Sequence, residues 1–148
     1  MRIVQAAPRH RAGWGRLFAG YAAFYGVAQT EAMRETVWGW ILDPSQEVKA
    51  LLAEAQDGEP VGLAHYRAFA RPLRASRGLL LDDLFVDPAW RGQGVADALL
   101  AALAERAAAE GCDVVRWITA EDNLRARAVY DRVAQATRWV TYDMPPAR

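Results

Sequence analysis

The sequence predicts an α/β fold in which a mixed, mostly antiparallel sheet is flanked by helices. Strand-like and helix-like segments alternate along the 148 residues, one pair of strands is joined by a hairpin turn signal, and one strand leads through glycines into an Ala/Leu-rich helix. The expected order is β-α-α-β-β-β-α-β-α-β. We expect one domain over residues 1–148, because no linker, repeat or low-complexity stretch interrupts the pattern.

The first elements are a short strand and two helices. Residues 3–6 predict the strand, and aromatic residues recurring at intervals of three and four predict a helix over 10–26. Thr30 can cap a second helix over 31–42, which we expect to end before Pro44.

The middle of the chain predicts strands. Residues 47–54 and 61–70 flank the turn signal Gln-Asp-Gly-Glu at 56–59, which indicates an antiparallel hairpin. A polar loop over 71–77 separates this hairpin from a strand over 79–86.

The last part alternates helices and strands. A helix over 94–110 is expected to stop at Gly111, and residues 113–120 predict the next strand. A helix over 124–134 and a final strand over 138–144 complete the prediction.

Composition excludes several classes of protein. The formal net charge is zero, so no overall field indicates binding to nucleic acid or to a membrane surface. No apolar run is long enough to span a bilayer, and no signal-peptide pattern opens the chain, which favours a cytoplasmic protein. Cys112 is the single cysteine, so no intrachain disulfide can form, and no His/Cys/carboxylate spacing indicates a metal.

The strand-to-helix junction after Val86 carries the strongest functional signal. Its residues are Arg91, Gly92, Gln93, Gly94, Val95, Ala96 and Asp97. The first N–H groups of a helix lack internal partners and the helix dipole is positive there, so a phosphate can satisfy both. Two glycines remove side chains that would block a diphosphate, and the arginine adds positive charge. No Gly-Lys-Ser/Thr follows, so the junction is not a nucleotide P-loop; a turn without a ligand remains the alternative.

This junction resembles the acetyl-CoA motif of the GNAT superfamily of N-acetyltransferases. The family's signature, Arg/Gln-x-x-Gly-x-Gly/Ala, is met by Arg91, Gly94 and Ala96, and the element order agrees along nearly the whole chain. The resemblance implies that amides of residues 92–97 hold the pyrophosphate of CoA. It also implies that Leu84, Phe85 and Val86 pair with the pantetheine arm as an added strand would.

A second segment, residues 120–133, resembles the part of the family in which Asn opens a helix and Tyr follows seven residues later. Here these residues are Asn123 and Tyr130, and seven residues return to nearly the same helix face. Considered without the other, Asn123 indicates a helix cap and Tyr130 indicates an aromatic residue of the core. By resemblance, both contact the cofactor, and Tyr130 is the general acid that protonates the departing CoA thiolate.

The acceptor amine must lose a proton before it attacks, because alkylamines have pKa values near 10. Asp82 and Asp83 follow one another on the strand beside the cofactor, as in polyamine acetyltransferases, where the first acid faces the acceptor. Neighbours on a strand face opposite ways, so we expect only one to face the amine and favour Asp82. The resemblance places the acceptor under the first two helices, so Tyr21 or Tyr25 is expected to contact it.

Other residues are weaker candidates. His65 could act as a base, although a structural histidine is the simpler interpretation, and Cys112 has no His or Lys nearby in sequence to activate it. The Gly-Phe pair that family members commonly place after the Tyr is absent, and Trp139 is expected to fill that space.

The sequence therefore predicts an enzyme that moves acetyl from acetyl-CoA to a primary amine of a small molecule, polyamine-like or amino-acid-like, by direct attack in a ternary complex. A protein-lysine or N-terminal acetyltransferase and a CoA-binding regulator without catalysis remain alternatives. Six tryptophans in a small apolar domain favour a homodimer.

Overall fold

The computed structural model describes residues 1–148 and divides into two compact units, Met1–Ile118 and Thr119–Arg148, which are described separately. The first unit contains β1 (Arg2–Gln5), α1 (Arg11–Phe24), α2 (Glu31–Leu42), β2 (Lys49–Glu54), β3 (Pro60–Arg71), β4 (Ser76–Val86), α3 (Val95–Ala109) and β5 (Val115–Arg116). The second unit contains α4 (Leu124–Val133).

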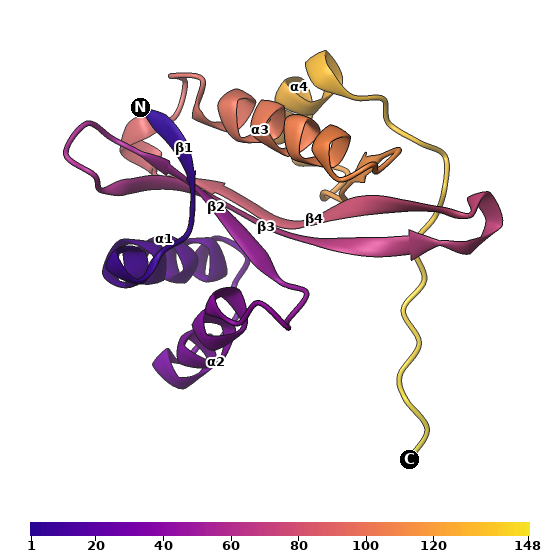
Figure 1. The fold of residues 1–148 in the computed structure, drawn as a ribbon, viewed down its shortest axis with the longest axis horizontal. Helices are drawn as coiled ribbons and strands as arrows, with labels where there is room; N and C mark the ends of the chain where they lie inside the picture. The colour runs from indigo at the N-terminus through magenta and orange to yellow at the C-terminus, as the bar shows by residue number, and fades with distance from the viewer. The chain divides into compact units, whose positions relative to one another are not determined.

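The first unit is built on one five-stranded sheet with the order β1-β2-β3-β4-β5. Neighbouring strands run antiparallel except β4 and β5, which are parallel. Helices α1 and α2 lie on one face of the sheet and α3 lies on the other (Figure 1). The expected mixed, mostly antiparallel α/β architecture is confirmed.

The core lies on both faces of β3. On the face under α1, Trp14 packs against Trp38 of α2 with ring centroids 4.8 Å apart, and the Trp14 side chain is fully buried. On the other face, a Cβ added to Gly62 would come within 2.8 Å of Val95, so this glycine lets α3 lie directly on the sheet.

Several helix boundaries agree closely with the sequence prediction. Helix α2 spans residues 31–42, and the Thr30 hydroxyl accepts a hydrogen bond from the backbone N–H of Met33 as a cap. Helix α3 begins one residue later and ends one residue earlier than expected.

Two strand predictions were wrong. The strand expected over residues 113–120 is reduced to β5, because only Val115 and Arg116 pair with β4. The strand expected over 138–144 does not form, since residues 135–148 lie in no helix or strand. Trp139 fills no space in a core: its side chain is 89% exposed.

No helix of the structure combines the length and the apolar character that crossing a membrane requires.

Candidate active site

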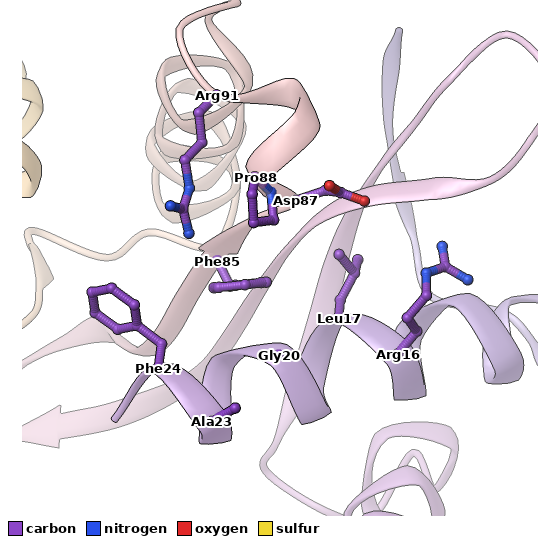
Figure 2. A pocket seen from close by; sticks show the side chains of 9 residues that line it. All are labelled: Arg16, Leu17, Gly20, Ala23, Phe24, Phe85, Asp87, Pro88 and Arg91. Atoms are coloured by element: carbon purple, nitrogen blue, oxygen red, sulfur yellow. The ribbon is translucent and has the colours of Figure 1, made fainter. Parts of the chain in front are cut away.

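A pocket of about 530 Å³ opens between α1 and the end of β4. Figure 2 shows Phe85 of β4 above α1 and Arg91 reaching toward it from the turn that follows the strand. The lining residues are Arg16, Leu17, Gly20, Ala23, Phe24, Phe85, Asp87, Pro88 and Arg91. The pocket therefore adjoins the strand-to-helix junction that the sequence singled out.

The junction uses both glycines in a backbone conformation that other residues rarely adopt. Gly92 has φ +76° and Gly94 has φ +80°, and a Cβ added to either would meet no atom within 4 Å. Gly94 is also the cap residue of α3 and supplies no side-chain oxygen to the first helical N–H groups. The turn thus leaves open space in front of the N-terminus of a 15-residue helix, where an anion is favoured.

Arg91 adds an uncompensated positive charge beside this turn. Its guanidinium lies 5.7 Å from the centroid of the Phe85 ring and forms no ion pair within the chain. An arginine that stacks on an aromatic ring without a carboxylate partner is available to an anionic ligand.

Tyrosines of α1 reach the same region. The Tyr21 ring meets the Phe85 ring edge-on with centroids 6.0 Å apart, and the Tyr25 ring lies 4.9 Å from the Tyr21 ring. Tyr25 is 47% exposed. The structure therefore brings Tyr21, Phe85 and Arg91 together around one region, and Tyr25 extends it toward solvent.

A β-bulge corrects the expectation that Asp82 and Asp83 face opposite ways. His65 pairs with Asp83 and Tyr66 pairs with Leu81, so Asp82 is an extra residue on β4. Asp83 contacts His65 and Asp82 contacts Arg67, and these two partners are two residues apart on β3. Residues two apart on a strand share a face, so the bulge turns both carboxylates to the same side of the sheet.

The two carboxylates have different partners. Arg67 donates two hydrogen bonds to Asp82, of 2.9 and 3.2 Å, and the bond to Asp82 raises the pKa of the Arg67 guanidinium. Asp83 Oδ2 lies 2.8 Å from Nδ1 of the buried His65. Asp82 is thus held as a bidentate ion pair, whereas Asp83 is held by a ring nitrogen.

The second unit contains the other two candidates. The Asn123 side chain accepts a hydrogen bond of 3.3 Å from the N–H of Ala126 and caps α4. Tyr130 is the seventh residue of the same helix and is partly buried. The local cap role that the sequence allowed for Asn123 is therefore present.

The thiol of Cys112, the single cysteine, is unsuited to nucleophilic attack. Burial raises the pKa of the Cys112 thiol above its ordinary value of 9.0, which disfavours the reactive thiolate. The structure contains no group of three or more His, Cys, Asp or Glu side chains that could hold a metal ion.

Sequence reasoning did not identify Arg16, Gly20 and Phe24 of α1 as lining residues of the pocket. Gly20 carried a usable signal, because a glycine inside an apolar helix often marks close packing. A Cβ there would come within 3.1 Å of the Phe85 ring, so the glycine lets α1 approach β4.

The known proteins that this chain is similar to include acetyltransferases. A family model described as the acetyltransferase (GNAT) family matches residues 14–134. A D-amino-acid N-acetyltransferase of Saccharomyces cerevisiae is 28% identical over 144 residues, covering 95% of this chain and 89% of the relative.

Solved structures agree with this match. The crystal structure of a probable acetyltransferase superposes with a TM-score of 0.88 at 28% identity, covering 100% of this chain and 99% of the other. An aminoglycoside N-acetyltransferase in complex with CoA superposes with a TM-score of 0.85 at 21% identity, covering 98% and 94%.

Proposed function

Since the chain belongs to the GNAT family of acetyltransferases, we propose that it moves acetyl from acetyl-CoA to a primary amine of a small molecule by direct attack in a ternary complex. Dependence on acetyl-CoA follows from the family. The observation that carries the proposal is the turn at Gly92 and Gly94, whose left-handed glycines leave open space before the N-terminus of α3.

The donor is expected to lie along the end of β4 and across this turn. Amides of residues 92–97 would bind the diphosphate of acetyl-CoA, and the uncompensated Arg91 would add charge to the same group. Leu84, Phe85 and Val86 would offer backbone groups to the two amides of the pantetheine arm.

The proton steps require a base for the acceptor and an acid for the leaving thiolate. Asp82 and Asp83 lie on the same face of the sheet as Phe85 of the pocket, and one of them would take the ammonium proton. Tyr130 would protonate the CoA thiolate, and Asn123 would contact the cofactor from the start of α4. A thiol pKa near 8.5 and a phenol pKa near 10 make this proton transfer nearly balanced.

The acceptor is expected to be a small primary amine, amino-acid-like or polyamine-like. Tyr21 and Tyr25 would give the acceptor aromatic contacts next to Phe85 of the pocket, which suits an ammonium group on an organic skeleton. The yeast relative named for D-amino acids supports an amino-acid-like amine.

The domain organisation, cellular location and oligomeric state belong to the same proposal. We expect a single N-acetyltransferase domain over residues 1–148, and the family match supports it because it spans both compact units. A cytoplasmic homodimer that requires neither a nucleic acid nor a membrane completes the proposal.

A panel of amines tests the activity. Acetyl-CoA is incubated with the protein and, separately, D- and L-amino acids, polyamines, an aminoglycoside and a lysine-containing peptide, while release of the free CoA thiol is followed. The proposal predicts release that depends on at least one small amine. Release only with the peptide would make the protein a peptide acetyltransferase, and binding of acetyl-CoA without any turnover would make it a regulator.

A further inference from the structure

Trp14, His65 and Asp83 form a chain of two hydrogen bonds under α1. The indole Nε1 of Trp14 lies 2.8 Å from Nε2 of His65, and Nδ1 of the same ring lies 2.8 Å from Asp83 Oδ2. Trp14 is fully buried and His65 is 2% exposed, whereas the Asp83 side chain is 25% exposed. The chain therefore runs from the core to a carboxylate that solvent and ligands can reach.

This arrangement fixes the tautomer of His65. An indole N–H can only donate, so Nε2 of His65 must accept and carry no proton. The neutral ring then holds its proton on Nδ1 and donates it to Asp83. An imidazolium would place a second N–H against that of Trp14, so the charged form is excluded while the Trp14 contact persists.

No other charged group competes for His65. From α1, the ring meets Trp14 and the edge of Phe18, whose ring centroid lies 4.7 Å away. On the neighbouring strands, it pairs with Ala50 of β2 and Asp83 of β4.

The charged groups nearby are already paired with others. Arg67 contacts Asp82 and, at 4.0 Å, Glu47. Arg11 lies over the Trp14 ring and pairs with Glu31 and Glu35. Asp83 is thus the single charged partner of the imidazole.

The partners of Asp82 and Asp83 distinguish the two carboxylates. Both oxygens of Asp82 accept from Arg67. Asp83 accepts one hydrogen bond, at Oδ2, and its Oδ1 accepts none within the chain. Asp83 also shares a strand face with Phe85, roughly 7 Å further along β4, which lines the pocket. A neutral donor leaves the charge of Asp83 uncancelled, whereas Arg67 cancels that of Asp82.

The following inference rests on the proposed function. We propose that Asp83, rather than Asp82, binds the acceptor ammonium and takes its proton. His65, which Trp14 locks in one tautomer, is the positioning residue that aims this carboxylate.

The proton and electron changes balance without a further reactant. An N–H bond of the ammonium breaks and an O–H bond forms at Asp83 Oδ1. The nitrogen lone pair then attacks the thioester carbon, the carbon–sulfur bond breaks with its electrons on sulfur, and the thiolate takes the second proton of the nitrogen through the general acid. Asp83 returns its proton to solvent, so ammonium and acetyl-CoA yield amide, CoA thiol and one proton.

The tautomer lock is tested with Trp14→Phe, which keeps an aromatic ring and deletes the N–H. Trp38→Phe is the matched control, because Trp38 belongs to the same core cluster and makes no hydrogen bond to His65. The hydrogen bond at each ring nitrogen of His65 is followed through its nitrogen chemical shifts by NMR. Wild type and Trp38→Phe should show the Nδ1–H tautomer with Nε2 accepting a hydrogen bond, whereas Trp14→Phe should lose the shift that marks the hydrogen bond at Nε2.

The same variants are compared in turnover. Trp14→Phe should lower kcat by about tenfold with unchanged affinity for acetyl-CoA, because the ring that aims Asp83 is no longer held. Trp38→Phe should lower the melting temperature through a similar loss of core packing and keep a kcat close to that of wild type. A wild-type His65 that carries its proton on Nε2 would overturn the lock.

The roles of the side chains are tested by substitution. Asp83→Asn should lower kcat/KM by about 10²–10⁴, with a loss at least roughly tenfold larger than that of Asp82→Asn. His65→Leu should lower kcat by about 10–100-fold with unchanged affinity for acetyl-CoA, because a misaimed base costs rate. His65→Asn should recover most of this loss, since its side-chain N–H lies as many bonds from Cβ as Nδ1.

The outcomes separate this inference from the proposed function. If no amine is acetylated by wild type, the proposed function fails together with the assigned role of Asp83, and the NMR measurement of the tautomer still decides the lock on His65. If wild type is active and Asp82→Asn loses more than Asp83→Asn, the inference is overturned while the function stands. Equal activity of His65→Leu and wild type would overturn the positioning role.

Discussion

At the scale of single residues, the proposed reaction depends on two groups that move protons: a carboxylate for the acceptor amine and the Tyr130 hydroxyl for the leaving thiolate. The carboxylates of Asp82 and Asp83 differ in their partners more than in their position, since one faces an arginine and the other a neutral imidazole. This difference in charge compensation is the reason for proposing that Asp83 holds the acceptor ammonium.

Replacing Tyr130 by Phe removes the hydroxyl and keeps the ring. If Tyr130 is the general acid, turnover should fall by about 10²–10⁴, while stability changes by about one hydrogen bond, roughly 1 kcal/mol. Affinity for acetyl-CoA should stay the same, because the thioester sulfur is a poor acceptor. Tyr142→Phe removes a hydroxyl from a side chain that is 90% exposed in the same unit and serves as the control. Near-normal turnover of a folded Tyr130→Phe would show that another group protonates the thiolate.

Glu54 is a buried charge whose role is structural. Its carboxylate on β2 accepts hydrogen bonds from Arg9 and His10. These bonds lower the pKa of Glu54 from 4.5 to about 2, and the bond from Arg9 has the larger effect. A lowered pKa means that this stabilisation is complete above pH 4.5 and is lost as the pH falls toward 2.

Glu54→Gln should therefore be less stable than wild type at neutral pH, and the gap in melting temperature should narrow between pH 4.5 and 2. Glu59→Gln, at a side chain that is 60% exposed, should show no such narrowing. A gap for Glu54→Gln that stays constant with pH would contradict the assigned role.

At the scale of elements, the junction from β4 to α3 is where backbone conformation and binding meet. Gly94→Glu places a carboxylate where the diphosphate is expected, so acetyl-CoA affinity should fall by at least about 100-fold, equivalent to losing two charged hydrogen bonds. Gly111→Glu is the matched control, because Gly111 at the other end of α3 has φ +71° and the same open space. Calorimetry that finds wild-type affinity in folded Gly94→Glu would remove this turn from the binding site.

Local signals explain which elements could be predicted. Helix α2 follows from the Thr30 cap, and the glycine turn follows from conformations that only glycine adopts readily. These are properties of neighbouring residues, so the sequence contains them.

Pairing between distant residues explains the failures. The strand-forming residues 138–144 find no partner strand, and a strand exists only where a neighbour supplies hydrogen bonds. The bulge at Asp82 depends on how β3 and β4 align, so the sequence could name both carboxylates but not their shared face.

At the scale of the whole molecule, apolar surface favours association. Trp139, Tyr142 and Met144 are each at least 89% exposed, although they are large and apolar. We expect light scattering at high micromolar concentration to give twice the chain mass of 16.4 kDa. Trp139→Ser should weaken the dimer, whereas Leu73→Ser, at a fully exposed side chain elsewhere, should not. A monomer at that concentration would contradict the expectation.

Direct transfer in a ternary complex is tested most directly by initial rates of CoA release with acetyl-CoA and an accepted amine varied together. Direct attack in a ternary complex predicts that the rate rises with both concentrations and that double-reciprocal lines intersect, because the amine attacks while acetyl-CoA is bound. CoA release that does not depend on the amine would contradict this mechanism. Parallel lines, together with an acetylated protein that forms when the amine is left out, would also contradict it.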